Sequence, residues 1–247
     1  MNNLDFLMNN LIAHRGYWDM ALGIPENSIS SFKRAIEYKY PIELDIHVLK
    51  DNTVVVFHDD NLKRMTGLNK EIADCTYSEI KKLYLQGTQE KIPTLKEVLE
   101  LVNGKVPLLI EFKSDGHLKE LEKEAMKLLI NYKGKFGIQS FNPLCVNYFK
   151  KYYPNIPRGQ LSHSHINSNI PFIAKFALKN MIFNIFTKPD FISYDISNCN
   201  KNKILKWEQK RMVFGWTVRS KEQYEENKKI FDNLIGENME HYIHKTP

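Results

Sequence analysis

The sequence has few cysteines, and their arrangement excludes two kinds of small stabilised domain. Three cysteines, Cys75, Cys145 and Cys199, lie far apart in 247 residues, and no Cys-x-x-Cys pair occurs. An odd number of widely spaced cysteines predicts neither a disulfide framework nor a zinc knuckle. We therefore expect reduced, buried thiols, which are typical of a cytoplasmic protein.

Long apolar runs are also missing. No stretch approaches the roughly 20 apolar residues that a membrane-spanning helix needs. Residues 1–16 have no basic segment ahead of an apolar one, and Asp5 interrupts their apolar residues, so we do not expect a secretory signal in them. The sequence thus predicts a cytoplasmic protein, with a location at the membrane surface left open.

Blocks of like charge are absent as well. Lysine and arginine number 35 against 29 aspartates and glutamates, a formal net charge of +6 that is spread along the chain. This distribution excludes a nucleic-acid-binding tail. A mild positive field favours anionic small molecules or an anionic membrane surface as partners.

What the chain does contain is an alternation of short apolar, β-branched runs with longer stretches of helical period. Eight such runs in one chain of this length recur about every 31 residues, the spacing of a (β/α)₈ barrel. They are Leu11–Ala13, Ile42–Val48, Val54–Phe57, Val106–Phe112, Phe136–Gln139, Arg158–Leu161, Phe191–Tyr194 and Val213–Val218. A ninth run, Asn233–Ile235, is interpreted as terminal structure.

No linker rich in proline, glycine or serine divides the sequence, so one domain over residues 1–247 is expected. The stretch at about 63–93 is long for one connection and is interpreted as a small helical insertion after the third strand. Thr94 and Glu97 form a capping box that predicts a helix start. A doubly wound open sheet is the alternative architecture, but eight evenly spaced units favour a closed barrel.

Polar side chains follow four of the predicted strands. They are His14 and Arg15 after the first strand, Glu43, Asp45 and His47 in the second, His58 after the third, and Glu111 and Lys113 at the fourth. The carboxyl ends of barrel strands open on one rim, where barrel enzymes carry out their chemistry. We therefore expect these residues, apart from His47 at the edge, to converge in one site.

The residue types predict what such a site can do. Three carboxylates suit a hard divalent cation, Mg²⁺ or Ca²⁺. Arginine and lysine bind phosphate, and histidines exchange protons near neutral pH. Together they predict cleavage of a phosphate ester by acid–base catalysis with metal-assisted charge stabilisation.

The same residues carry a resemblance to a known family. The order and spacing of these motifs along nearly the whole chain resemble the glycerophosphodiester phosphodiesterase family. The matching motifs are His14-Arg15-Gly16, Pro25-Glu26-Asn27-Ser28, Glu43-Leu44-Asp45, Lys50-Asp51, Val55-Val56-Phe57-His58-Asp59, Leu62, Arg64, Thr66, Gly67, Ile92-Pro93-Thr94-Leu95, Glu111-Phe112-Lys113, Gln139-Ser140-Phe141 and Trp216-Thr217-Val218.

The resemblance implies a TIM barrel and an enzyme that hydrolyses glycerophosphodiesters to glycerol 3-phosphate and an alcohol, in lipid and glycerol metabolism. It implies a divalent metal on Glu43, Asp45 and Glu111. It also implies His14 and His58 as the acid–base pair, without saying which is the acid, and phosphate contacts from Arg15 and Lys113. The nucleophile, water or the glycerol hydroxyl, stays open.

The chain departs from the family pattern near its end. Arg219 stands where the family commonly has asparagine, and Leu234-Ile235-Gly236-Glu237-Asn238 replaces an ending that usually contains proline. These changes concern substrate choice rather than the chemistry.

Trp216 is either a core aromatic residue or a wall against the glycerol of the substrate. Placement at the top of the barrel favours the wall, and the same argument applies to Phe141.

Two further points stay open at this stage. Residues 171–187 are unusually apolar and predict either a helix packed on the barrel or an exposed patch for a membrane or a second copy. Alternative functions are a lysophospholipase D or phospholipase D-like activity on lipids, and a catalytically silent barrel that only binds. Retention of both histidines, three carboxylates and two cations argues against the silent barrel.

Overall fold

A computed structural model describes residues 3–114, 120–162, 181–198, 201–208 and 211–241. The chain divides into two compact units. The N-terminal unit is residues 13–136. The C-terminal unit is residues 137–247 together with residues 1–12.

The N-terminal unit is built on a sheet whose central strand is β2. The elements of this unit are β1 (Ile12–Ala13), η2 (Met20–Leu22), α1 (Ile29–Glu37), β2 (Ile42–Val48), β3 (Val54–Val56), α2 (Lys63–Thr66), η3 (Ile72–Asp74), α3 (Tyr77–Ile80), α4 (Leu95–Val102), β4 (Leu108–Phe112) and α5 (Glu120–Leu129). Strands β1 and β4 both pair with β2 in parallel. All seven residues of β2 are buried, as expected for a parallel strand covered on both faces.

The expected strand at Val54–Phe57 exists, but it is not one of the parallel strands. β3 pairs with β2 antiparallel, with His47 opposite Val55. The reason is the connection, residues 49–53, which is much shorter than the crossover that a parallel pair requires. The prediction that this run is a barrel strand was therefore wrong.

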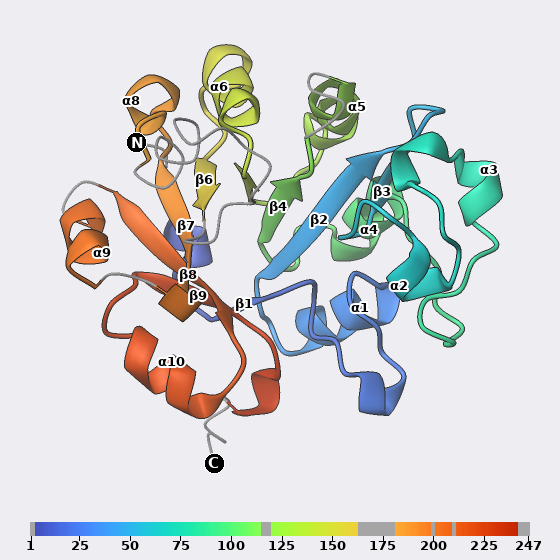
Figure 1. The fold of residues 1–247 in the computed structure, drawn as a ribbon, viewed down its shortest axis with the longest axis horizontal. Coiled ribbons are helices and arrows are strands. Elements are labelled where there is room, and N and C mark those ends of the chain that lie inside the picture. The colour runs from blue at the N-terminus through green and yellow to red at the C-terminus, as the bar shows by residue number, and fades with distance from the viewer. Residues whose placement is uncertain (1–2, 115–119, 163–180, 199–200, 209–210, 242–247) are drawn as a thin grey trace. The chain divides into compact units, whose positions relative to one another are not determined.

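The helical insertion after β3 is confirmed and has its own small core. Helices α2, η3 and α3 lie within it, and Figure 1 shows α2 and α3 at the outer edge of the N-terminal unit. Its buried side chains pack with those of β3 and the residues beside it in one cluster: Leu49, Val55, Phe57, Leu62, Met65, Ile72, Cys75, Ile80, Leu85 and Ile92. Thr94 accepts a hydrogen bond from the Glu97 backbone at 3.2 Å, which completes the predicted cap of α4.

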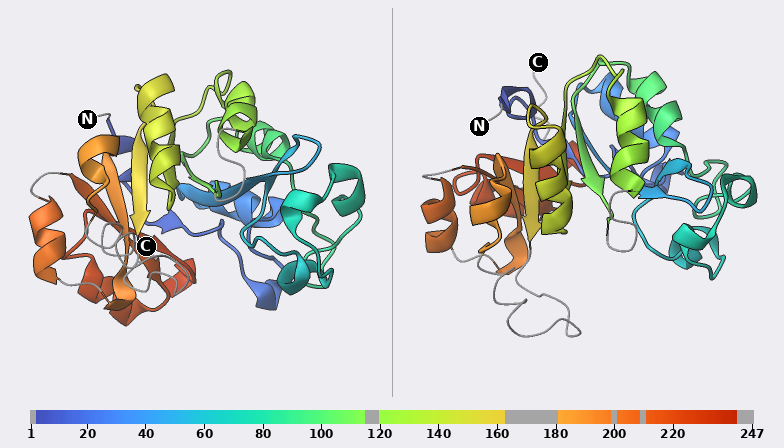
Figure 2. Two further views of the ribbon diagram at one scale, coloured as in Figure 1. Left: turned by 45° about the horizontal axis from the view of Figure 1, so that its top comes forward. Right: turned by 90° about the horizontal axis from the view of Figure 1, so that it is seen from above.

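The C-terminal unit is a run of parallel strands with helices between them. Its elements are η1 (Asp5–Leu7), β5 (Phe136–Ser140), α6 (Pro143–Tyr152), β6 (Arg158–Ser162), α8 (Asn184–Thr187), β7 (Phe191–Asp195), η4 (Ile196–Asn198), α9 (Lys201–Glu208), β8 (Met212–Val218), α10 (Lys221–Asn227), β9 (Asn233–Gly236) and η5 (Met239–His241). Each strand from β5 to β9 pairs in parallel with the next. Figure 2 shows α6 beside β6 in both of its views.

The run at Asn233–Ile235, interpreted as terminal structure, is instead a strand of this sheet. β9 pairs in parallel with β8, and the Asn233 side-chain amide donates to the backbone carbonyls of Leu7 and Asn10. With β3 set aside and β9 included, the described residues contain eight strands that alternate with helices. This is the composition of a (β/α)₈ barrel, so the predicted fold class is confirmed, while the single domain over 1–247 stays a prediction.

The cysteines and the helices bear on two expectations for the chain. Cys75 and Cys145 are buried free thiols, as expected, whereas Cys199 lies outside the described residues. Within the described ranges, every helix is too short or too polar to cross a membrane.

Candidate active site

Three carboxylates meet on one face of the sheet in the N-terminal unit. Asp45 of β2 and Glu111 of β4 are partners in the parallel register. Glu43 lies two residues before Asp45 and so points to the same face. One oxygen from each of the three lies within 4.8 Å of the others. The side chains are 1%, 1% and 6% exposed for Glu43, Asp45 and Glu111, so the predicted convergence of the three acids is confirmed.

Two cations compensate this negative charge. Lys113, at the end of β4, places its Nζ 3.0 Å from Asp45 Oδ1 and 2.5 Å from Glu111 Oε1. Arg15 places Nε 3.6 Å from Asp45 Oδ2. Both side chains predicted to bind phosphate therefore lie against the carboxylates.

The backbone at Arg15 and Gly16 has an unusual conformation that serves the site. Arg15 has φ = 56° and Gly16 has φ = 85°, in the left-handed region that most residues avoid. This turn lets the Arg15 N–H donate to Glu43 Oε2 at 3.0 Å. A Cβ on Gly16 would lie 2.4 Å from Ser31 Oγ. The His-Arg-Gly motif is thus explained by backbone shape and close packing as well as by side-chain chemistry.

Asn27 and Glu26 join the site from the loop before α1. Asn27 is 2% exposed, and its Nδ2 donates to Asp45 Oδ2 at 2.9 Å. The Glu26 carboxylate accepts from Arg15 NH1 at 2.8 Å. The cap of α1 is Ser28, which leaves the Asn27 side chain for Asp45.

The two histidines flank the carboxylates. His14 Nε2 lies 4.0 Å from Glu43 Oε2. His58 Nδ1 lies 2.7 Å from Asp59 Oδ1. His47 bonds through Nε2 to the backbone carbonyl of His58 at 3.2 Å and is outside the carboxylate group. This contact gives His47 a structural role beside His58 and does not make it a fourth ligand.

Arg64, from helix α2 of the insertion, forms hydrogen bonds with two acidic residues of the site, Asp59 and Glu26. Its Nε and NH2 donate to the two oxygens of Asp59 at 2.6 and 2.9 Å. Its NH1 and NH2 also donate to Glu26 at 3.1 and 2.6 Å. Arg64 belongs to the motifs that resemble the family, but its position in the sequence does not indicate a role. Only the folded insertion shows that it connects Asp59, beside His58, with Glu26, beside Arg15.

The carboxylates have strongly perturbed pKa values. Burial, and then repulsion from Asp45, raises the pKa of Glu43 well above its ordinary value, and burial raises the pKa of Glu111 to about 7. Burial opposes ionisation of Asp45 too, but Lys113, followed by His58 and Arg15, holds its pKa well below the usual range. Burial disfavours the Lys113 ammonium, yet Asp45 and Glu111 raise its pKa above the ordinary value.

His58 is held in its neutral form. Burial, with Lys113 and Arg15 nearby, lowers the pKa of His58 to about 4. Burial disfavours the Asp59 carboxylate, but hydrogen bonds from Arg64 and His58 lower its pKa to about 2. An ionised carboxylate only accepts, so the proton of the neutral ring lies on Nδ1 and the lone pair on Nε2.

The donor set fits a divalent metal. Buried carboxylates are costly unless a cation compensates them, and the raised pKa values of Glu43 and Glu111 indicate that Lys113 and Arg15 do not fully do so. Three hard oxygen donors from Glu43, Asp45 and Glu111 match the preference of Mg²⁺ and Ca²⁺.

The two aromatic residues predicted to contact substrate belong to the C-terminal unit. Phe141 and Trp216 pack edge to face, with ring centroids 5.8 Å apart. The two departures near the chain end also meet there, because Arg219 Nε donates to Glu237 Oε2 at 3.0 Å. No local sequence pattern predicts this pair, whose members lie 18 residues apart. Of the apolar stretch 171–187, residues 171–180 lie outside the described residues.

The chain is similar to known proteins in both sequence and structure. The profile of the "Glycerophosphoryl diester phosphodiesterase family" matches residues 14–240. A "Glycerophosphodiester phosphodiesterase" of Caldanaerobacter subterraneus subsp. tengcongensis is 33% identical over 248 aligned positions, covering 94% of this chain and 96% of that protein. The human "Lysophospholipase D GDPD1" is 34% identical over 134 residues, which cover 49% of this chain and 41% of that protein.

Solved structures are similar over nearly the full length. A glycerophosphodiester phosphodiesterase of Thermotoga maritima has a TM-score of 0.71 and 27% identity, covering 92% of this chain and 93% of that one. A phosphodiesterase of Oleispira antarctica, solved with the product sn-glycerol-3-phosphate, has a TM-score of 0.79 and 22% identity, covering 93% of each chain.

Proposed function

The chain belongs to the Glycerophosphoryl diester phosphodiesterase family, and we propose that it hydrolyses glycerophosphodiesters to glycerol 3-phosphate and an alcohol at the Glu43, Asp45 and Glu111 cluster. The observation that carries the proposal is the approach of these three buried carboxylates to within 4.8 Å of one another. Lys113 and Arg15 beside them, and two histidines at their edge, complete the set that phosphodiester cleavage needs.

The three carboxylates would hold Mg²⁺ or Ca²⁺. When bound, such a cation supplies a Lewis acid that stabilises the negative charge of the pentacoordinate phosphorus. Asn27 holds Asp45 by its side-chain amide, and the Arg15 N–H holds Glu43. These contacts fix the carboxylate oxygens in place before a ligand arrives, which favours tight binding.

Arg15 and Lys113 bind the phosphate of the substrate. Both are buried cations with raised pKa values, because the nearby carboxylates outweigh the effect of burial. They stay charged throughout the pH range of enzymes. A guanidinium contributes a fork of N–H donors, and the ammonium contributes a compact charge. Both stabilise the additional negative charge that develops on the phosphoryl oxygens in the transition state.

His58 acts as the general base and His14 as the general acid. The neutral ring of His58 keeps Nδ1–H on Asp59, so Nε2 accepts the proton of the attacking hydroxyl group. As the new P–O bond forms, the bond from phosphorus to the alcohol breaks, and His14 donates a proton to the departing oxygen. The proton balance is the same whether water or the glycerol 2-hydroxyl attacks; in the second case water then opens the cyclic phosphate.

Phe141 and Trp216 form an aromatic wall for the glycerol, since their edge-to-face pair offers an apolar surface. Lysophospholipids are the second candidate substrate class, favoured by the similarity of half the chain to a lysophospholipase D. A cytoplasmic location is supported by the free thiols Cys75 and Cys145.

The test is an assay of the purified chain with glycerophosphocholine and, separately, a lysophosphatidylcholine. We expect release of glycerol 3-phosphate with Mg²⁺ or Ca²⁺, loss of turnover in EDTA, and loss in Glu43→Gln. Glu37→Gln, on the exposed face of α1, is the matched control and should keep full activity. Full turnover in EDTA would refute the metal proposal, and release of lysophosphatidate alone would favour the lipid substrate.

A further inference from the structure

The short segment around helix α8 has its apolar and polar faces reversed. Among residues 181–187, the inward positions follow the helical period: Met181, Asn184 and Thr187 are 6%, 6% and 3% exposed. Two of these three are polar. A helix that packs on a sheet in water normally presents its apolar side inward, so this segment is not explained by packing alone.

The large apolar side chains of the segment face solvent instead. Ile185 and Phe186 are 69% and 66% exposed, and Ile182 and Phe183 are 38% and 37% exposed. Single exposed apolar residues are ordinary on protein surfaces, but a contiguous group of four marks an interaction surface.

The backbone of this segment is anchored, so the exposed side chains are held outward. Lys150 of α6 donates through Nζ to the Phe186 carbonyl, and Arg158 NH2 donates to the Lys188 carbonyl at 3.0 Å. Thr187 Oγ1 donates back to the Phe183 carbonyl at 3.1 Å. These contacts leave the apolar side chains no inward position to occupy, because Asn184 and Thr187 already take those places.

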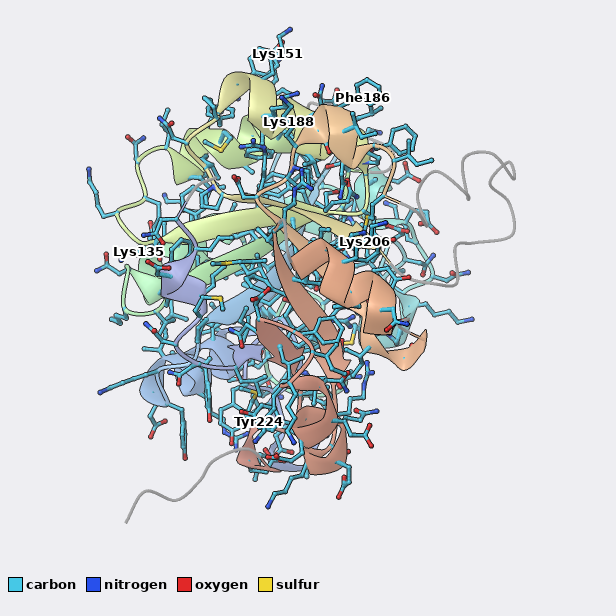
Figure 3. The ribbon with its side chains drawn as sticks, turned by 90° about the vertical axis from the view of Figure 1, so that its left-hand side faces the viewer. Lys135, Lys151, Phe186, Lys188, Lys206 and Tyr224 are labelled. Atoms are coloured by element: carbon cyan, nitrogen blue, oxygen red, sulfur yellow. The ribbon has the colours of Figure 1, made fainter. Side chains whose placement is uncertain are left out.

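The charged side chains of helix α6 and residues 181–189 are all positive. Helix α6 and residues 181–189 together contain Lys150, Lys151 and Lys188 and no aspartate or glutamate. Lys151 and Lys188 are exposed. Figure 3 shows Lys151, Phe186 and Lys188 toward the same end of the C-terminal unit. We name Ile182, Phe183, Ile185 and Phe186 with these three lysines the α6–α8 patch.

We propose that the α6–α8 patch binds the surface of an anionic phospholipid membrane. Apolar side chains that enter the boundary between headgroups and acyl chains, with lysines beside anionic headgroups, are the two requirements for peripheral binding. A second copy of this chain fits less well. A twofold contact through the patch would bring the lysines of both copies together, and the patch offers no carboxylate to compensate them.

The test measures co-sedimentation of the full chain with vesicles of phosphatidylglycerol and, in parallel, of phosphatidylcholine. We expect binding to the anionic vesicles that weakens as salt rises, and little binding to phosphatidylcholine. The double variant Ile185→Ser, Phe186→Ser should weaken binding about tenfold or more, because both side chains lose their transfer into the interface. Lys151→Gln and Lys188→Gln should each weaken it about fivefold.

Matched variants control for exposure alone. Ile130→Ser changes a side chain that is 67% exposed, and Lys96→Gln changes a lysine whose side chain is 70% exposed; both lie in the other unit and should bind vesicles like the parent chain. Equal loss in the control variants, or no binding to phosphatidylglycerol, would overturn the proposal. So would concentration-dependent dimers that the serine pair abolishes. Binding is read without turnover, so the result is separate from the phosphodiesterase assay.

Discussion

At the scale of single residues, His58 depends on its neighbour Asp59. Nδ1 of His58 lies 2.7 Å from Oδ1 of Asp59. This carboxylate keeps the imidazole proton on Nδ1, so Nε2 can accept a proton. We expect His58→Ala to lower kcat by about 100-fold or more, the usual contribution of a general base. Asp59→Asn should lower kcat by about tenfold or more, since an amide no longer selects the tautomer.

The control for this prediction is Asp60→Asn, which removes the exposed acid next along the chain. Its kcat should be unchanged, and thermal unfolding should show that all three variants stay folded. If Asp59→Asn and Asp60→Asn had the same kcat, orientation of His58 by Asp59 would be ruled out.

Replacement of Gly16 by alanine should lower the free energy of unfolding. Alanine at this position meets both a φ of +85° and a Ser31 Oγ only 2.4 Å from the new Cβ. Gly67 has a similar φ of +80° with open space around the Cβ position. Gly67→Ala should therefore cost about 1 kcal/mol for backbone conformation, and Gly16→Ala about 1–3 kcal/mol more for the overlap.

Urea unfolding of the two glycine variants measures the difference. Gly16→Ala should also lose turnover beyond its loss of stability, because a shifted turn moves the Arg15 N–H away from Glu43. Equal unfolding free energies in the two variants would show that Ser31 moves aside easily.

The individual site residues were largely predictable from the sequence, because each one lies within an apolar run or directly after it. Asp45 and Glu111 became neighbours through strand register, and a strand period of two placed Glu43 on their face. Contacts made through loops were not predictable in this way. Glu26, Asn27 and Asp59 bond across gaps in sequence that no local periodicity encodes.

At the scale of elements, the insertion after β3 contributes to the site through Arg64. Its guanidinium bonds Asp59 and Glu26, so we expect Arg64→Ala to lower kcat about 10- to 100-fold through misplacement of His58 and Arg15. The stability cost should stay within about 1 kcal/mol, because the Arg64 side chain is 43% exposed and solvent screens its ion pairs.

Two variants sharpen the Arg64 prediction. Arg64→Lys keeps the charge but cannot bond both carboxylates with a planar fork, so it should recover only part of kcat. Lys63→Ala, at the neighbouring exposed position of α2, should leave kcat unchanged. A rise in KM with unchanged kcat in Arg64→Ala would contradict a positioning role and indicate a direct substrate contact.

The strands show why counting apolar runs is not sufficient. The sequence contains nine apolar runs. Eight of them were predicted to be barrel strands, and one of these, Val54–Phe57, is not a barrel strand. The five-residue link between Val48 and Val54 already requires an antiparallel pair, so β3 could have been excluded by connection length. β9 is short and pairs with its neighbour β8. The length of such a short apolar run does not indicate whether it is terminal structure or a strand of the sheet.

At the scale of the whole molecule, the carboxylate cluster couples folding to metal and to pH. Burial raises the pKa of Glu111 to about 7 in the folded chain, from an ordinary 4.5. A carboxyl whose pKa rises on folding binds its proton more tightly when folded. It therefore lowers stability as pH rises from about 4.5 to about 7.

A divalent cation bound to the cluster would remove this penalty, because it would compensate the ionised carboxylates and need them deprotonated. At a free metal concentration about 100 times Kd, binding should add about 2.7 kcal/mol of stability. For a chain of this size that corresponds to a rise in Tm of about 5–10 °C. The rise in Tm on adding Mg²⁺ or Ca²⁺ should be larger at pH 8 than at pH 5.5, where protons compete for Glu111.

Glu43→Gln should lose this rise in Tm. Its Tm without metal should be no lower than that of the parent chain, because one repelling buried carboxylate is gone. Scanning calorimetry of both chains at the two pH values makes the comparison, and an equal rise at both, or a rise retained in Glu43→Gln, would mean that the metal stabilises the fold elsewhere.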